Sequence, residues 1–325
     1  MTTMKAVVQD SYGSAEVLRM REIDRPTAGD GEVVVQVRAA GISRGDLHVM
    51  NGHPYLLRLL GYGVRRPKNP VPGQDVAGTV VAIGPSVTRF TIGDEVFGIA
   101  RGSFAEYTSA HEDKLAHKPA GLSFEQAAAM PVSGLTALRA LDRAGVRAGQ
   151  TVLVVGASGG VGTYAVQLAT AAGATVTGVA STRKLGLVRD LGAADVIDYT
   201  KEDFVDGSRA FDVILDIGGV TPIERLRRAL TRTGTLVIVG GENGATWSPG
   251  MGRQLHATLL NPFVSQRLTM VMNKEHYSGL ERLAAFAEDG AVASFMDRPF
   301  SLSDAADAVG HLEGGRAMGK VVITV

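Results

Sequence analysis

The sequence predicts an α/β protein in which a doubly wound parallel sheet is inserted between two pieces of a β-rich domain. The chain is β-rich to about residue 125, alternates strands and helices from about 126 to 290, and returns to short strands from about 291. With 325 residues it is also longer than a single core usually grows, so two domains are expected. We assign residues 1–125 and 291–325 to one domain and residues 126–290 to the other.

The first part is predicted to be a compact barrel. Apolar, β-branched runs separated by Gly, Pro and Asp predict strands at 33–39 and 76–83, and a turn followed by a short strand at 93–98. The last segment, 320–325, has the same character and closes the chain with another strand.

The second part shows the alternation typical of a parallel sheet with right-handed crossovers. A helical stretch at 124–141, interrupted around 131–134, precedes it. Strands are expected at 151–155, 174–179, 195–197, 212–215 and 235–239, and helices at 160–172, 183–191, 222–231 and 276–289.

Composition excludes several classes of function. The formal net charge is zero, so the chain lacks the basic surface typical of nucleic-acid binding, and no basic amphipathic segment predicts a membrane surface. No apolar run approaches the roughly 18–20 residues that span a bilayer, and residues 1–9 lack a signal peptide's apolar region. Cysteine is absent, which excludes disulfides and thiolate–metal sites. The cytoplasm is the simplest location.

The segment 151–162, TVLVVGASGGVG, predicts a dinucleotide site. A buried strand runs into a glycine-rich turn, and a helical pattern follows at once. Residues without a Cβ let the backbone approach a pyrophosphate, and the new helix turns its N–H groups and dipole toward the negative charge. The alternative is a glycine-rich structural turn. The loop positions assigned to the cofactor are Gly156, Ser158, Gly159, Gly160, Val161 and Gly162.

Over nearly its whole length, the chain resembles the zinc-free quinone oxidoreductase-like branch of the medium-chain dehydrogenase/reductase superfamily. Besides the glycine loop, the matching segments are AGISRGD (40–46), VPGQDVAGTV (71–80), VTRFTIGDEV (87–96), SGLTA (133–137), LGAADVIDY (191–199) and GKVV (319–322). The resemblance implies a GroES-like β-barrel domain, an inserted Rossmann domain, and a cleft between them that holds the nicotinamide.

The same resemblance argues against a metal. Alcohol-oxidising relatives hold a catalytic zinc with cysteine and histidine, and the corresponding positions here are Ser43 and Gln74, neither of which is a normal zinc ligand. The lobe that binds structural zinc in those relatives is replaced by the short run 97–103. Without zinc, no Lewis acid lowers the pKa of an alcohol, so alcohol oxidation is disfavoured.

The cofactor is predicted to be NADPH. NAD-binding folds place an acid at the end of the second strand, but here the strand 176–179 is followed by Ser181, Arg183 and Lys184, which suit a 2′-phosphate. The alternative for the two cations is an ordinary solvated helix start. The resemblance adds Tyr199 and Arg316 as residues near the adenosine phosphate.

At the reactive end, the resemblance places the nicotinamide near Val132, Thr136, Gly240 and Gly241. Reduction of a carbonyl compound puts negative charge on oxygen, which calls for hydrogen-bond donors. Ser43, Tyr55 and His48 are the candidates, although many relatives have Asn at the position of Ser43. The alternatives are that Ser43 caps a helix, Tyr55 packs and His48 lies at the surface. Asp46 is expected to fix the local loop.

Two apolar segments, 54–64 and 247–263, are expected either to line the substrate site or to form core or subunit contacts. A homodimer is expected through the sheet edge near 267–272. The predicted function is zinc-independent, NADPH-dependent reduction of quinones or α,β-unsaturated carbonyls. The alternatives are an NADPH-binding sensor or structural protein with little catalysis, and a zinc-dependent alcohol dehydrogenase.

Overall fold

The computed structural model describes residues 2–240, 251–271 and 275–325. The chain forms two compact units, Met1–Leu135 with Lys274–Val325, and Thr136–Asn273. These limits differ from the expected domain boundaries near 125 and 290. The reason is that helix α3 (Phe124–Ala128) packs on strands of the first unit, and helix α9 (Tyr277–Glu288) packs there as well. The predicted positions Gly241, Trp247 and Met272 lie outside the described residues.

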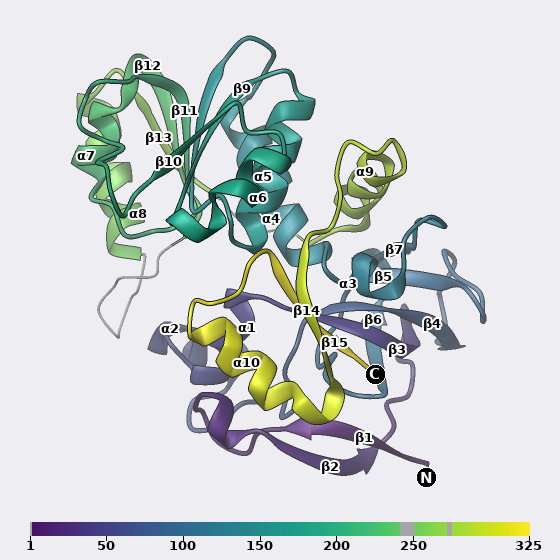
Figure 1. Ribbon diagram of the computed structural model, residues 1–325. Coiled ribbons are helices and arrows are strands. Elements are labelled where there is room, and N and C mark those ends of the chain that lie inside the picture. The colour runs from purple at the N-terminus through teal and green to yellow at the C-terminus, as the bar shows by residue number, and fades with distance from the viewer. Residues whose placement is uncertain (1, 241–250, 272–274) are drawn as a thin grey trace. The chain divides into compact units, whose positions relative to one another are not determined.

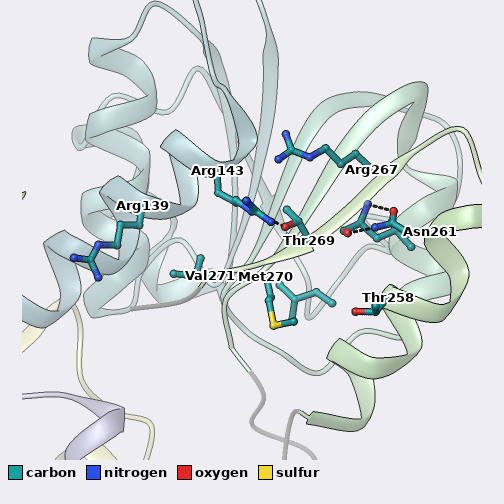
Figure 2. Close-up of a pocket in the computed structure, with 11 residues that line it drawn as sticks. Arg139, Arg143, Thr258, Asn261, Arg267, Thr269, Met270 and Val271 are labelled. Carbon is teal, nitrogen blue, oxygen red and sulfur yellow. Dashed lines mark hydrogen bonds between the residues drawn. The ribbon is translucent and has the colours of Figure 1, made fainter. Parts of the chain in front are cut away.

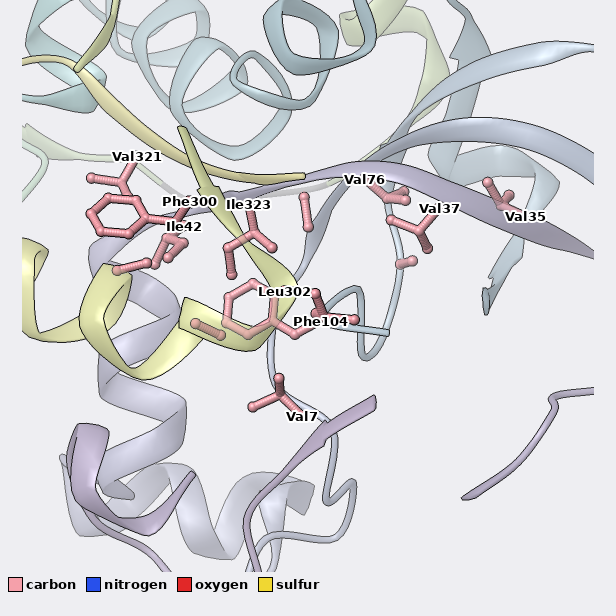
Figure 3. Packing of buried hydrophobic residues seen from close by; sticks show 14 of the residues in the cluster. Val7, Val35, Val37, Ile42, Val76, Phe104, Phe300, Leu302, Val321 and Ile323 are labelled. Carbon is pink, nitrogen blue, oxygen red and sulfur yellow. The ribbon is translucent and has the colours of Figure 1, made fainter. Parts of the chain in front are cut away.

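The first unit is built on a seven-stranded sheet with the order β14-β15-β3-β4-β5-β7, with β6 also paired to β3, and a separate β1–β2 ladder. Its strands are β1 (Thr3–Val8), β2 (Arg19–Asp24), β3 (Glu32–Ile42), β4 (Asp75–Ile83), β5 (Glu95–Ile99), β6 (Tyr107–His111), β7 (Leu115–His117), β14 (Met296–Ser301) and β15 (Lys320–Thr324). Side chains of these strands form a buried apolar cluster with residues of neighbouring segments; it includes Val37, Val76 and Ile323 from the strands and Phe104 from the loop between β5 and β6 (Figure 3).

Helices interrupt this unit more often than the sequence predicted. Besides α3 and α9 it contains α1 (Arg44–Asn51), the short α2 (Tyr55–Leu57) and α10 (Ala305–Glu313). The short strands expected after residue 291 are present as β14 and β15, but the helix α10 between them was not predicted. Ala305, Ala308 and Val309 of α10 are buried in the same cluster as β15, so small residues at helical spacing decide the structure there.

The second unit contains a six-stranded parallel sheet with the order β10-β9-β8-β11-β12-β13. Its strands are β8 (Thr151–Val155), β9 (Thr175–Ala180), β10 (Asp195–Asp198), β11 (Phe211–Asp216), β12 (Leu230–Ile238) and β13 (Arg267–Met270). The chain proceeds from β8 outward to β10, then crosses to β11 on the other side of β8. The strand order therefore reverses between β8 and β11, which is the switch point where doubly wound sheets bind ligands.

The helices of this unit are α5 (Gly160–Ala171), α6 (Leu185–Asp190), α7 (Ile223–Arg228) and α8 (Met251–Leu260). Figure 1 shows α5 and α6 on one side of the sheet and α7 and α8 on the other, as a doubly wound topology requires. Helix α4 (Pro131–Ala144) begins in the first unit and continues into the second. The expected interruption around 131–134 falls earlier, at Ala129 and Met130, because Pro131 is tolerated as the first residue of α4.

Within the described residues, no helix is both long and apolar enough to cross a membrane.

Candidate active site

The glycine loop forms a tight turn from β8 into α5. Gly156 has φ +85°, a conformation that L side chains rarely adopt, and Gly159 is the N-cap of the helix. A Cβ on Gly162 would lie 2.2 Å from the carbonyl oxygen of Gly156, so only glycine allows the helix to start this close to the turn. The first-turn N–H groups of α5 have no partners within the helix. The loop therefore offers the close backbone approach and unpaired donors that a pyrophosphate needs.

The ends of three neighbouring strands are tied together beside this loop. The carbonyl oxygen of Val155 accepts hydrogen bonds of 3.0 Å from the N–H groups of Ile217 and Gly218, and that of Asp216 accepts two of 3.0 Å from Val239 and Gly240. A Cβ on Gly240 would lie 2.1 Å from the Ile217 carbonyl oxygen. Gly240, predicted to lie near the nicotinamide, thus belongs to the edge of the sheet that carries the glycine loop.

Four residues predicted to bind the adenosine phosphate lie at the ends of β9 and β10. Ser181 is the N-cap of a short 3-10 turn, Thr182–Lys184, that contains Arg183 and Lys184. The backbone N–H of Tyr199 donates to the carbonyl oxygen of Ala180 at 3.3 Å, and its side chain is 57% exposed. The parallel pairing of β10 with β9 therefore brings Tyr199 beside this cationic turn.

Sequence reasoning missed an acid at this position, Asp198. It pairs with Ala180 in the β9–β10 register, and its carboxylate accepts hydrogen bonds from the hydroxyls of Thr182 and Thr200. These hydroxyl donors lower the pKa of Asp198 to about 2. The two threonine hydroxyls bind the Asp198 carboxylate, and Nζ of Lys201 lies 3.6 Å from its Oδ2. These partners offset a negative charge that would otherwise repel a phosphate. The register of adjacent parallel strands is the signal that could have revealed this residue.

Arg316, the remaining predicted phosphate ligand, belongs to the first unit. It is exposed and lines a cavity of about 420 Å³ together with Asp304, Asp307 and His311.

Ser43 caps α1, which was the alternative considered for it. Its side chain accepts from the backbone N–H of Asp46, and the Asp46 carboxylate accepts from both the N–H and the hydroxyl of Ser43 at 2.7 Å. The other carboxylate oxygen, Oδ1, is buried and has no hydrogen-bond partner in the described part of the chain. Burial, and then the nearby charge of Asp75, raises the pKa of Asp46 to about 6. Asp46 thus fixes the local loop as expected, and the Ser43 hydroxyl donates to it.

Behind this cap lies a buried ion pair that the sequence did not reveal. The ammonium group of Lys320 lies 2.8 Å from Oδ2 of Asp75, and both side chains are almost completely buried. Oδ1 of Asp75 accepts a 2.7 Å hydrogen bond from the backbone N–H of Val132, at the start of α4. Val132, a predicted nicotinamide neighbour, is therefore held in place by its backbone. Thr136 lies one turn further along α4 and is also buried.

The other two predicted donors lie in α1 and α2. His48 is partly buried in the last turn of α1. Tyr55 packs with its ring centroid 4.6 Å from that of His53, and the Arg58 guanidinium lies 4.7 Å from its centre. The segment that follows exposes Leu59 and Val64, so part of the predicted apolar wall faces solvent.

Ser43 and Gln74, at the positions expected for zinc ligands, do lie close together. A Cβ on Gly45 would be 3.4 Å from the Ser43 hydroxyl oxygen and 4.0 Å from Nε2 of Gln74. A hydroxyl and an amide are poor zinc ligands. Over the described ranges, no group of three or more His, Asp or Glu side chains is arranged to hold a metal ion.

A cavity of about 430 Å³ in the second unit is lined in part by Ala257, Thr258 and Asn261, which belong to the apolar segment 247–263 (Figure 2). It lies between α4, α8 and the edge strand β13. Nε of Arg143 donates to the Thr269 hydroxyl at 2.8 Å on one wall, and Asn261 bonds the backbone of Leu268 on another. None of the predicted cofactor positions lines this cavity.

Comparison with known proteins agrees with this architecture. A family model described as an alcohol dehydrogenase GroES-like domain matches residues 29–120, and one described as zinc-binding dehydrogenase matches residues 191–323. The chain is 35% identical over 337 residues to the 2-methylene-furan-3-one reductase of Solanum lycopersicum, covering 98% of this chain and 79% of that protein. The chain belongs to the medium-chain dehydrogenase/reductase superfamily, in its zinc-free quinone oxidoreductase branch.

Two further comparisons support this membership. The chloroplastic NADPH-dependent alkenal/one oxidoreductase of Arabidopsis thaliana is 34% identical, with 98% of this chain and 79% of that protein covered. The solved structure of the quinone oxidoreductase from Coxiella burnetii superposes with a TM-score of 0.89 at 31% identity and covers all of both chains. The predicted fold class, a GroES-like domain with an inserted Rossmann domain, is confirmed.

Proposed function

We propose that this protein is a zinc-independent oxidoreductase that uses NADPH to reduce quinones or α,β-unsaturated carbonyl compounds by hydride transfer. The observation that carries the proposal is a glycine loop at the switch point of a parallel sheet, in a chain whose zinc-ligand positions hold Ser43 and Gln74. The relatives support the substrate class, since one is named a reductase of an enone and another an NADPH-dependent alkenal/one oxidoreductase.

The described residues suit this cofactor. When bound, NADPH supplies the hydride. We assign its pyrophosphate to the loop Gly156–Gly162, because the glycines have no Cβ to keep the phosphates away from the backbone. Ser181, Arg183, Lys184 and Tyr199 would hold the 2′-phosphate, with Arg316 as a further candidate. Val132, Thr136 and Gly240 would lie along the nicotinamide half.

At the substrate, the protein has to stabilise negative charge that develops on a carbonyl oxygen. Ser43, Tyr55 and His48 are the proposed donors. Because the Ser43 hydroxyl donates to Asp46, its use as a donor to substrate would require a rotation away from that carboxylate. We therefore expect Tyr55→Phe or His48→Gln to lower kcat more than Ser43→Ala does.

The function is tested by following NADPH oxidation at 340 nm with a panel of quinones and enones. Turnover above the enzyme-free rate with at least one acceptor supports the proposal, whereas tight NADPH binding without turnover would favour a sensor or structural protein. In the same assay, the Arg183→Gln/Lys184→Gln double variant should raise KM for NADPH roughly 10- to 100-fold and change KM for NADH little, because only NADPH carries the 2′-phosphate. Equal effects on both cofactors would contradict the assignment of these two cations.

We also propose a homodimer formed at the edge strand β13, which pairs only with β12 among the described strands. Next to this edge, Leu255 and Leu259 of α8 are each 62% exposed and Phe263 is 84% exposed, which is unusual for large apolar side chains. Light scattering of the purified protein tests this, and Leu259→Ser/Phe263→Ser should shift the mass toward the monomer. A cytoplasmic location remains part of the proposal and is tested by cell fractionation.

A further inference from the structure

The carboxyl end of β11 carries a buried ion pair that none of the roles above uses. Oδ2 of Asp216 lies 2.5 Å from Nη2 of Arg253 in α8, and its Oδ1 accepts a 3.1 Å hydrogen bond from the backbone N–H of Gly219. Nη2 of Arg253 also donates to the carbonyl oxygen of Thr221 at 2.6 Å. The Asp216 side chain is fully buried and that of Arg253 is 16% exposed.

One half of the guanidinium is left without a partner. Nη1 of Arg253 is buried and has no hydrogen-bond partner within the described residues. A buried cationic donor without a partner costs free energy, and a buried ion pair is often no more stabilising than an apolar pair of the same size. Anchoring α8 to β11 therefore does not account for an arginine here, whereas an anionic ligand would satisfy Nη1.

The pair sits at the switch point of the sheet. Asp216 is the last residue of β11, the neighbour of β8, and the loop that follows it touches the glycine loop: a Cβ on Gly156 would lie 3.1 Å from the backbone nitrogen of Gly218. Ligands of doubly wound sheets bind outside the strand ends at this point. In the described part of the unit, Asp216 is the charged group found in contact with Arg253. The Asp216 carboxylate already pairs with Nη2, so it does not provide a partner for Nη1.

We infer that Arg253 is a cofactor-binding residue whose Nη1 donates to the diphosphate of the dinucleotide, and that Asp216 is the positioning residue that holds the guanidinium. The inference rests on the proposed function, since it needs a dinucleotide at the glycine loop. The Asp216 carboxylate accepts hydrogen bonds from Nη2 of Arg253 and from the N–H of Gly219. It therefore fixes the guanidinium relative to the loop that touches Gly156. The α5 N-terminus and Arg253 would then supply donors to one anionic group.

The experiment measures binding of three probes by isothermal titration calorimetry: NADPH, adenosine 2′,5′-bisphosphate and adenosine 2′-monophosphate. These contain a diphosphate, a single 5′-phosphate and no 5′-phosphate, respectively. Arg253→Met should raise Kd for NADPH about 10- to 100-fold, as expected for loss of a charge-assisted hydrogen bond, and should leave Kd for adenosine 2′-monophosphate within twofold. Arg253→Lys keeps a cation for Asp216 but has no second nitrogen, so it should also weaken NADPH binding.

The control variant is Arg225→Met. Arg225 lies 2.5 Å from Asp203 in the same unit, but both side chains are about half exposed, so removing this arginine should change none of the three Kd values by more than twofold. The thermal midpoint of each variant reports on folding. If Arg253→Met does not fold, Arg253→Lys decides the question.

Three results would overturn the inference. One is an NADPH Kd that changes by less than threefold in the folded Arg253 variants. Another is an equal loss of binding for all three probes, which would indicate a general structural defect. If the unmodified protein fails to bind NADPH, the proposed function itself falls and the inference falls with it. If the unmodified protein binds NADPH and the Arg253 variants bind it with an unchanged Kd, only the role of Arg253 is overturned.

Discussion

Replacing Asp46 by Asn is expected to stabilise the protein at neutral pH, although it alters a helix cap. Asp46 is fully buried, its Oδ1 has no hydrogen-bond partner among the described residues, and the Asp75 carboxylate lies near it. Burial and this like charge outweigh the hydrogen bonds from Ser43 and the attraction of Lys320, which raises the pKa from 3.8 to about 6. This difference corresponds to about 3 kcal/mol of free energy.

The sign follows from proton linkage. Below pH 3.8 the carboxyl group is protonated in both the folded and the unfolded state, so it contributes no pH dependence. Between pH 3.8 and about 6 the folded state holds the proton more tightly than the unfolded state, and stability falls as the pH rises. Above pH 6 the full cost of about 3 kcal/mol is present. An asparagine carries no charge and is free of this cost.

The assay is urea unfolding of the wild type and Asp46→Asn from pH 4 to pH 8, followed by circular dichroism. The variant's amide nitrogen would be buried without an acceptor, which adds a cost that does not depend on pH and cancels when pH values are compared. The free energy of unfolding of the variant minus that of the wild type should therefore grow by about 2–3 kcal/mol between pH 4 and pH 7.5.

A matched control is available in the Thr91–Asp94 turn. Asp94 also accepts hydrogen bonds from the N–H and the hydroxyl of a residue three positions earlier, Thr91, but it does so at the protein surface and with one bond on each carboxylate oxygen. The change in the free energy of unfolding caused by Asp94→Asn at each pH therefore measures effects common to this local motif. It is subtracted from the change caused by Asp46→Asn. A difference that stays constant within about 0.5 kcal/mol over this pH range, or that shrinks as the pH rises, would refute the reasoning about Asp46.

Three further predictions concern other parts of the molecule. Lys320→Met should lower the free energy of unfolding by about 3–5 kcal/mol, because the buried Asp75 carboxylate loses its cation; a loss below 1 kcal/mol in urea unfolding would contradict this. Gly162→Ala should weaken NADPH binding at least tenfold in fluorescence titration, since its Cβ would lie 2.2 Å from the Gly156 carbonyl oxygen. Gly310→Ala, a helix position with nothing within 4 Å of the added Cβ, is the control and should stabilise by about 0.5–1 kcal/mol. Dialysis against a chelator should leave NADPH-dependent turnover unchanged, and restoration of lost activity by added zinc would be evidence against metal independence.

The parts of the fold that the sequence predicted well depend on local patterns. The strand 151–155 and the glycines that follow it specify a buried strand, a tight turn and a helix within a dozen residues, so β8 and α5 lie where expected. The pairing of distant strands is a different matter. Asp198 lies beside Ser181 only because β10 pairs with β9, and Asp216 meets Arg253 only when α8 packs near the end of β11.

The candidate catalytic residues were predicted less securely for a related reason. A serine before a helix and a serine in an active site look alike in sequence, and the structure shows that Ser43 caps α1. Lys320 and Asp75 are 245 positions apart in the chain, so no local pattern could have paired them. Roles that depend on long-range contacts had to come from the structure.

The place of β15 in the first sheet has a consequence for folding during synthesis. β15 pairs with β3 and also carries Lys320, the partner of Asp75, yet it is translated after every other strand of its unit. The second unit contains all its strands between residues 151 and 270, so it can fold while the ribosome is still adding the rest. During that interval the β3 edge that will receive β15 lacks its partner, and the Asp75 carboxylate lacks its cation. We expect nascent chains of this protein to depend on chaperones until the last strand emerges, because an unpaired strand edge is a template for aggregation.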